Sequence, residues 1–172
     1  MTKVMAKAVC TTVGSPLGEL LLVGEESATA NGGTALASLS LPGQKGGVVV
    51  QDGWVRDDEA FSVIAGQLRA YFDGTRQRFD IEYARGVGTD FQQRVWQALD
   101  ALPYGTTTTY GKLAAQLGLS RVAVRALGTA IGRNPLLVVR PCHRVIGADG
   151  SLTGYAGGLE AKRRLLDLES KI

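Results

Sequence analysis

The segment Thr109–Ile131, TYGKLAAQLGLSRVAVRALGTAI, predicts two short helices joined by a tight turn. Thr109 is a favourable N-cap residue, and apolar side chains follow it at helical spacing as far as about Leu117. Gly118 ends that helix, and Ser120 can cap a second helix that runs to the end of the segment. Two short helices connected by a turn that contains glycine form a helix-turn-helix, whose second helix usually enters a groove of DNA.

The distribution of charge also favours DNA as a partner. No acidic residue lies between Asp100 and Asp149, whereas this interval holds six basic ones: Lys112, Arg121, Arg125, Arg133, Arg140 and Arg144. The net charge of the chain is +3, so taking away these six charges leaves −3 for the remaining residues. A basic stretch on a neutral-to-acidic body is typical of a protein that binds a polyanion. The alternative is a solvated face whose acidic partners come from elsewhere in the chain.

Another helix precedes this pair and opens a C-terminal domain. Thr89 and Gln92 form a capping-box pattern, and an apolar stripe of Phe91, Val95, Trp96 and Leu99 follows. Pro103-Tyr104-Gly105 ends this helix. Because residues 85–88 read as a glycine-containing linker, we expect domains at residues 1–85 and 86–172.

The N-terminal half reads as a small α/β unit. Strands are expected at Val9–Val13 and Leu20–Val23, joined by a turn at residues 14–18. Three further segments are expected to extend the sheet: Leu36–Leu41, Val48–Val50 and Phe79–Tyr83. From about Asp57 to Phe72 the apolar residues recur at helical spacing, and Asp73-Gly74 ends that helix.

Pro141-Cys142-His143-Arg144-Val145 combines a nucleophilic sulfur with the only histidine of the chain. The thiolate is the nucleophilic form, and a free cysteine has a pKa of about 8.5, so Cys142 needs a proton acceptor. Neighbouring side chains of an extended segment point to opposite faces. We therefore expect His143 to act through a bridging water, with a distant carboxylate orienting its imidazole. The alternative is a buried cysteine at a strand end beside a hydrogen-bonded histidine.

Composition excludes several classes of protein. The 172 residues, 45% of them hydrophobic, suffice for one large domain or two small ones. No segment approaches the roughly 20 apolar residues that span a membrane, and the N-terminus has no signal-peptide pattern. Cys10 and Cys142 do not make a disulfide framework, which favours the cytoplasm, and with one histidine they are a poor ligand supply for zinc.

Taken together, these segments resemble the O6-alkylguanine-DNA alkyltransferase family, also called methylated-DNA–protein-cysteine methyltransferases. The resemblance covers essentially all of residues 89–172, in the family's order and spacing. It is looser in the first half, where it rests on residues 15–18 and 71–74. The matching motifs are residues 90–99, Pro103-Tyr104-Gly105, residues 109–114, Arg125-Ala126-Leu127-Gly128, Asn134-Pro135, residues 141–145 and Gly154-Tyr155-Ala156-Gly157-Gly158-Leu159.

The resemblance implies a fold and a reaction. The fold would be an α/β N-terminal domain with a ribonuclease H-like sheet and helices, and a mainly α C-terminal domain with a winged-helix-like helix-turn-helix. Cys142 would irreversibly accept an alkyl group from guanine O6, or from O4 of thymine, so one protein molecule would act once and without a cofactor. His143 would act as base through a water, Glu169 would orient it, and Asn134 would brace the turn beneath the cysteine.

The resemblance also implies how DNA is bound. A base inside a duplex has to be flipped out, at a free energy of a few kcal/mol, before it can meet the sulfur. Arg125 would fill the vacated space, and Tyr110 would crowd the phosphate of the flipped nucleotide. The helix, with Arg121, Ala123 and nearby Lys112, would enter the minor groove of double-stranded DNA. The pocket would be lined by Val145, Tyr155, Ala156 and Gly157, in a protein that acts as a monomer; whether it binds DNA cooperatively stays open.

The sequence departs from the family pattern at three places. Arg140 stands before Pro141, where the family usually has an aliphatic residue, so a charge lies where a buried strand end is expected. Ala156 replaces a frequent serine or glycine and removes any hydroxyl contact there. The metal ligands of some animal relatives are absent, so no zinc is expected.

Three other functions stay open at this point. A non-catalytic lesion binder of the same family usually has tryptophan in place of the cysteine, which Cys142 argues against. A cysteine hydrolase would use Cys142 and His143 but would not explain the basic stretch. A helix-turn-helix regulator would leave the Cys-His pair unexplained.

Overall fold

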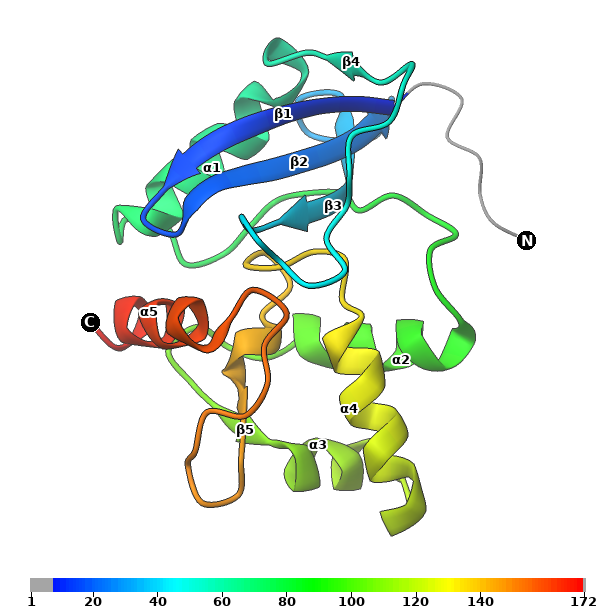
Figure 1. Ribbon diagram of the computed structural model, residues 1–172, viewed down its shortest axis with the longest axis vertical. Coiled ribbons are helices and arrows are strands. Elements are labelled where there is room, and N and C mark those ends of the chain that lie inside the picture. Colours follow the sequence, from blue (N-terminus) through cyan, green and yellow to red (C-terminus); the bar gives the residue numbers. More distant parts are fainter. Residues whose placement is uncertain (1–7, 172) are drawn as a thin grey trace. The chain divides into compact units, whose positions relative to one another are not determined.

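The computed structural model describes residues 8–171 (Figure 1). The chain divides into two compact units, which we call unit 1 (Met1–Val87) and unit 2 (Gly88–Ile172). Within the described residues, unit 1 contains a four-stranded sheet and unit 2 a two-stranded one. None of the helices in residues 8–171 is long and apolar enough to cross a membrane.

The sheet of unit 1 has the strand order β3-β2-β1-β4. Its strands are β1 (Ala8–Ser15), β2 (Gly18–Glu26), β3 (Thr34–Ser40) and β4 (Val55–Arg56). The first three pair antiparallel, and β1 and β2 are joined by the predicted turn, while β4 pairs parallel to β1. The β1–β2 turn depends on Gly18, whose φ of 98° favours glycine and whose Cβ, if present, would lie 2.9 Å from Pro42.

Two predicted strands of unit 1 are wrong. Val48–Val50 forms no strand and is exposed, and the outer edge of β1 pairs instead with β4, at Val9 and Cys10. Phe79–Tyr83 contributes one bridge, between Tyr83 and Leu36. The backbone of Asp80 bonds to the side chain of Gln67, with Asp80 N donating at 2.8 Å and Asp80 O accepting at 3.0 Å. These bonds satisfy the groups that a strand ladder would have used.

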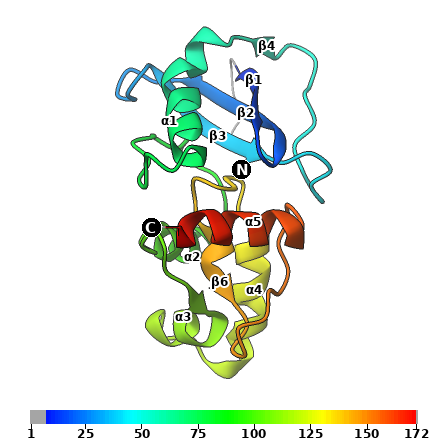
Figure 2. The ribbon, with the colours of Figure 1, turned by 90° about the vertical axis from the view of Figure 1, so that its left-hand side faces the viewer.

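One helix, α1 (Ser62–Phe72), lies along a face of the sheet in both ribbon views (Figure 2). It begins later than predicted, because a 3-10 turn, η1 (Glu59–Phe61), comes first. Asp57 Oδ1 accepts from Ala60 N of that turn at 3.1 Å. The predicted apolar stripe is confirmed, because most of its side chains are buried. Its buried members are Phe61, Ile64, Leu68 and Tyr71.

Unit 2 begins with α2 (Asp90–Asp100), and its predicted capping box is confirmed. Thr89 Oγ1 accepts from Gln92 N at 3.1 Å, and Gln92 Oε1 accepts from Thr89 N at 3.0 Å. The helix-turn-helix follows as α3 (Tyr110–Gln116) and α4 (Val124–Gly132), with α5 (Leu159–Ser170) near the end of the chain. Thr109 caps α3 as predicted, through Lys112 N at 3.1 Å.

The predicted start of the second helix needs a correction. Ser120 makes no capping hydrogen bond, because a 3-10 turn, η2 (Arg121–Ala123), follows it and α4 begins only at Val124. Two short strands that the sequence did not reveal, β5 (Thr108–Thr109) and β6 (Val145–Ile146), pair in parallel. This pair holds the start of α3 against the residues that follow the Cys-His motif.

Candidate active site

Cys142 is buried at the start of a single 3-10 turn, η3 (Cys142–Arg144). The expectation of an extended segment at this position is therefore wrong. Pro141, with φ −81° and ψ 59°, forms an inverse γ-turn in which Cys142 N donates to Arg140 O at 2.7 Å. Proline already fixes φ near this value, so Pro141 favours a sharp reversal of the chain over a continuing strand.

The chain that leads to this turn is held in an unusual conformation. Val138 has a φ of 72°, which β-branched residues rarely adopt and which costs about 1–3 kcal/mol. The buried side chain of Asn134 braces both ends of the loop. Asn134 Oδ1 accepts from Leu136 N at 2.9 Å, and its Nδ2 donates to Arg140 O at 3.1 Å. Asn134 thus braces the loop that leads into the cysteine turn.

His143, Arg144 and Glu169 form a buried cluster. Nε2 of His143 lies 2.7 Å from Oε2 of Glu169. Arg144 donates to both oxygens of the same carboxylate, from Nε at 2.7 Å and from Nη2 at 2.9 Å. Glu169 is 1% exposed and projects from α5, so the helix delivers the carboxylate that the imidazole needs.

The geometry indicates how His143 is protonated. Burial lowers the pKa of His143, although the hydrogen bond and the charge of Glu169 oppose this shift. We therefore assign a neutral imidazole at pH 7 with its proton on Nε2, because an N–H at that position donates to the carboxylate. Nδ1 then carries a lone pair, and it is buried without a hydrogen-bond partner in the described part of the chain. Such an acceptor is suited to take a proton through a water molecule.

The Cys142 thiol is protonated at rest. Burial raises its pKa to about 11, and this effect outweighs several neighbours that act in the other direction. The side chain of Asn134 lowers the pKa by hydrogen bonding, and the positive charges of Lys162 and Arg140 lower it further. Because the thiolate is the nucleophile, the thiol has to lose its proton during the reaction itself.

Lys162 is a residue of the site that the sequence analysis missed. It is 1% exposed, and its Nζ donates to Val145 O at 2.6 Å and to Thr153 O at 2.8 Å. The ammonium thereby fastens β6 and the following loop to α5. The available signal was its position on the helix, since Lys162 shares the buried face of α5 with Leu165 and Glu169.

The predicted pocket residues lie directly after the cysteine turn and in the loop that follows β6. Val145 is fully buried, and its N–H donates to the carbonyl of Cys142. Tyr155, Ala156 and Gly157 lie half-buried in the loop between β6 and α5. Burial raises the pKa of Tyr155 well above its usual value, with the Cys142 charge as the second cause, so Tyr155 lies near the sulfur.

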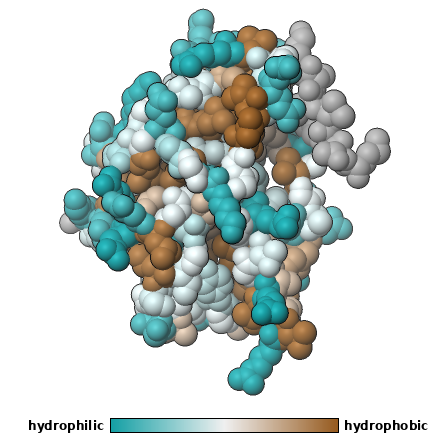
Figure 3. Space-filling model, in the orientation of Figure 1, coloured by the Kyte–Doolittle hydropathy of each residue, from teal (hydrophilic) through white to brown (hydrophobic). Residues whose placement is uncertain are grey.

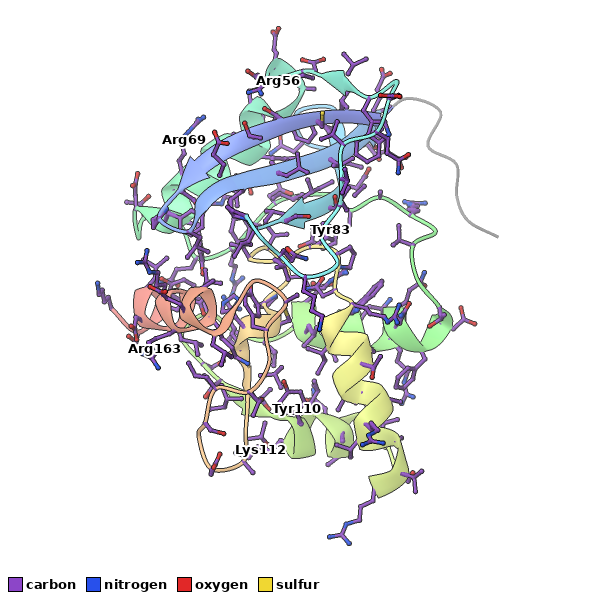
Figure 4. All side chains as sticks on the ribbon, in the orientation of Figure 1. Arg56, Arg69, Tyr83, Tyr110, Lys112 and Arg163 are labelled. Carbon is purple, nitrogen blue, oxygen red and sulfur yellow. The ribbon has the colours of Figure 1, made fainter. Side chains whose placement is uncertain are left out.

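The predicted DNA-binding residues lie on the helix-turn-helix. Tyr110 and Lys112 open α3 beside the loop that follows β6, where the Tyr110 hydroxyl accepts from Thr153 Oγ1 at 3.3 Å (Figure 4). Arg121 and Arg125 are exposed on η2 and α4, whereas Ala123 between them is half-buried. Hydrophilic and hydrophobic side chains project together at this end of unit 2 (Figure 3). Val122, 89% exposed, is the apolar member of this surface.

Two of the six bases in the acid-free stretch do not belong to this surface. Arg140 Nε lies 3.1 Å from Asp100 Oδ1, and Arg144 is held by Glu169. Both arginines are buried, and both acids come from outside the stretch. For these two residues the acidic partners do come from elsewhere in the chain, but the side chains are buried and do not form a solvated face. The exposed bases are Lys112, Arg121, Arg125 and Arg133.

Comparisons with known proteins show to which family the chain belongs. Residues 90–171 match the family model described as 6-O-methylguanine DNA methyltransferase, DNA binding domain. A methylated-DNA–protein-cysteine methyltransferase of Methanosarcina acetivorans is 45% identical over 155 residues, which cover 90% of this chain and 94% of that protein. The chain belongs to the methylated-DNA–protein-cysteine methyltransferase family. The family relation spans both units, since the coverage is nearly complete for both proteins.

The fold of this methyltransferase-family chain is similar to those of solved structures. The O6-methylguanine methyltransferase of Mycobacterium tuberculosis is similar with a TM-score of 0.80 and 44% identity, covering 95% of this chain and 93% of that one. A structure of the Mycobacterium tuberculosis protein in complex with DNA has the same TM-score and identity, covering 96% and 93%. Within residues 8–171 of this family member, no group of three His, Cys, Asp or Glu side chains is placed to hold a metal ion.

Proposed function

We propose that this protein repairs alkylated DNA by direct reversal, transferring an alkyl group from O6 of guanine to Sγ of Cys142. The observation that carries the proposal is the buried set of Cys142, His143 and Glu169 in a unit with an exposed basic helix-turn-helix. Family membership and the DNA complex of a similar Mycobacterium tuberculosis protein support it. O4-alkylthymine is proposed as a second substrate.

In the proposed reaction, the Cys142 thiol gives its proton through a water to Nδ1 of His143. Glu169, 2.7 Å from Nε2, stabilises the imidazolium that forms. The thiolate attacks the alkyl carbon, so a C–S bond forms while the C–O bond to guanine breaks. The electron pair of that bond stays on the guanine, and the proton returns to it from His143 through water. The N–H of Ala156 is proposed to donate to O6 as it gains charge.

The product explains why the protein would act once. A thioether on Cys142 has no hydrolytic exit. The other cysteine, Cys10, belongs to the core of unit 1 and is proposed to take no part. Both cysteines are unpaired, which supports the cytoplasm as the compartment in which a thiol of this kind stays reduced.

DNA binding is proposed to use the helix-turn-helix in the minor groove. Repair has to ignore base sequence, and the minor groove carries a degenerate code that suits this requirement. Arg125, exposed on α4, would occupy the space that the flipped nucleotide leaves, and Tyr110 would crowd the phosphate of that nucleotide. Lys112, Arg121 and the backbone near Ala123 would contact the strands on either side. We propose action as a monomer, with cooperativity on DNA undecided.

The finer description of the fold is also a proposal. In unit 1, three antiparallel strands followed by a fourth parallel to β1 support a ribonuclease H-like sheet. In unit 2, the β5–β6 pair beside α3 and α4 supports a winged-helix-like arrangement.

Mass spectrometry after mixing with duplex DNA that contains O6-methylguanine tests the function. We expect a mass increase of one methyl group per protein molecule and restored guanine in equal amount. Many guanines restored per protein molecule would contradict the single-use reaction and favour an enzyme that turns over. Tight binding without any mass increase would favour a non-catalytic lesion binder.

A further inference from the structure

Arg140 is a charged residue beside the site, and the proposed reaction gives it no role. It immediately precedes Pro141, and its side chain is 9% exposed. Its Nε donates to Oδ1 of Asp100 at 3.1 Å, and its Cζ lies 5.1 Å from the centre of the Trp96 ring. A guanidinium paired on one side and stacked on an aromatic ring is fixed in position rather than free to follow solvent.

The backbone of the same residue supports the cysteine turn. The carbonyl of Arg140 accepts from Cys142 N at 2.7 Å and from Asn134 Nδ2 at 3.1 Å. Thus one residue links three parts of unit 2: α2 through its side chain, and the Asn134 brace and the nucleophile turn through its carbonyl. Asp100 is the last residue of α2, where the helix dipole disfavours a negative charge, and the Arg140 guanidinium offsets that charge.

We propose that Arg140 is a positioning residue whose buried guanidinium, anchored on Asp100 and Trp96, supplies a fixed positive charge that favours the Cys142 thiolate. The inference rests on the proposed function, because a thiolate matters only if Cys142 is the nucleophile. Arg140 lies two residues before Cys142 and its carbonyl is bonded to Cys142 N, so its buried guanidinium extends from the nucleophile turn itself. A buried charge is screened less by water than an exposed one. The direction agrees with the lowering of the Cys142 pKa by Arg140.

Other titratable groups lie near the thiol and have to be held constant in a test. Lys162 lies on α5, Tyr155 lies in the loop before it, and the cluster of His143, Arg144 and Glu169 surrounds the turn. The test therefore changes only the Arg140–Asp100 pair. Because Asp100 carries the opposite charge, removing it and removing Arg140 break the same ion pair but change the potential at the sulfur in opposite directions.

The experiment measures the rate at which iodoacetamide alkylates Cys142 at pH 8, in full-length protein with Cys10→Ser and without DNA. In this reaction sulfur bonds to carbon, iodide leaves and the thiol proton passes to the buffer. We expect Arg140→Leu to be slower than Asp100→Asn by about tenfold or more, since a unit charge near a buried group acts at an effective dielectric constant of about 20. Arg140→Lys, which keeps the charge, should stay within about threefold of the parent protein.

A matched control separates this local effect from net charge. Arg163 is exposed on α5, so Arg163→Leu removes the same charge from unit 2 and should leave the rate unchanged (Figure 4). If the pair only stiffened the turn, Arg140→Leu and Asp100→Asn would shift the rate equally and in the same direction, and that result would overturn the inference. If Arg140→Leu fails to fold, equal or slower reaction of Asp100→Asn relative to the parent overturns it.

The same variants keep the two proposals apart. If the unsubstituted protein takes no methyl group from DNA while the rate ratios hold, the proposed function is wrong and the charge effect stands. If methyl transfer occurs but the ratio between the two variants is close to one, the proposed function stands and the role of Arg140 is wrong.

Discussion

Replacing Glu169 with glutamine is the perturbation whose effect the structure defines best. The carboxylate accepts a hydrogen bond from His143 at 2.7 Å and bonds from Arg144 at 2.7 and 2.9 Å. Glutamine has one acceptor oxygen, and its NH₂ group then faces another donor. A charged Arg144 is left in a buried position without its full counter-charge.

The magnitude follows from the bonds that are lost. A hydrogen bond to a charged group contributes about 1.5–3 kcal/mol, and breaking a buried ion pair from one side costs about 3–5 kcal/mol. Because glutamine keeps one acceptor, we expect Glu169→Gln to lower the free energy of unfolding of unit 2 by about 2–4 kcal/mol. With a slope of about 2 kcal/mol per molar urea, the midpoint should fall by about 1–2 M.

The assay is urea unfolding followed by tryptophan fluorescence. Trp54 belongs to unit 1, so a Trp54→Phe background lets Trp96 report on unit 2. Glu160→Gln is a matched control, because it makes the same change on the same helix at a side chain that is 82% exposed and paired with Arg164 at 3.3 Å. This control should cost less than about 0.5 kcal/mol.

The same variant tests the proton path. Without the carboxylate, the imidazolium is no longer stabilised, so methyl transfer by Glu169→Gln should slow by about 10²-fold or more, as expected for loss of general-base catalysis. Equal stability losses in Glu169→Gln and Glu160→Gln, or an unchanged transfer rate in the first, would refute the assignment of Glu169 as the carboxylate that supports His143.

Four further results are expected. Peptide mapping after reaction with methylated DNA should find the methyl group on Cys142, and a methyl group on Cys10 would contradict the site. Arg125→Ala should slow repair of duplex DNA more than reaction with free O6-alkylguanine, whereas equal losses would place Arg125 in the pocket or the fold. The logarithm of the affinity for unmodified duplex should fall with the logarithm of the salt concentration at a slope of about −2 to −3, because each phosphate contact of Lys112, Arg121 and Arg133 contributes about 0.9. A flat response would contradict a DNA-scanning surface. Burial lowers the pKa of His143, so its neutral form contributes stability that is full above about pH 6.5, the pKa of histidine in the unfolded chain, and is lost as pH falls below it. Urea midpoints should therefore drop from about pH 7 to about pH 5, and less steeply in His143→Gln.

Features of the fold that depend on neighbouring residues could be predicted from the sequence. The capping box of Thr89 and Gln92 closes over three residues, so its signal is complete in the sequence. The fate of Val48–Val50 was not predictable in this way. Whether an apolar run pairs depends on which sheet edge is free, and β4 takes the edge of β1. That competition is settled by the whole of unit 1.

In the site, too, some residues could be predicted from the sequence and others could not. Asn134, Cys142 and His143 carry motif signals, whereas Lys162 becomes part of the site only because α5 turns one face toward β6. Alternation along a short segment predicts an extended conformation at Cys142–Arg144, and it cannot reveal that Pro141 reverses the chain. Side-chain type identified the chemistry, and packing fixed the direction of each group.

The grouping of charged residues differs between the sequence and the structure. Counted along the chain, Arg140 and Arg144 belong to a basic stretch, but in the structure they lie with Asp100, Glu169 and Lys162 around the cysteine turn. Counting Arg140, Arg144 and Lys162 against Asp100 and Glu169, this group carries one positive charge while His143 is neutral, and all of these side chains except that of Asp100 are buried. A thiolate on Cys142 would bring the total to zero. Burial disfavours the thiolate by desolvation and keeps the thiol protonated, whereas the surrounding positive charge favours the thiolate. The thiolate therefore forms when His143 removes the proton.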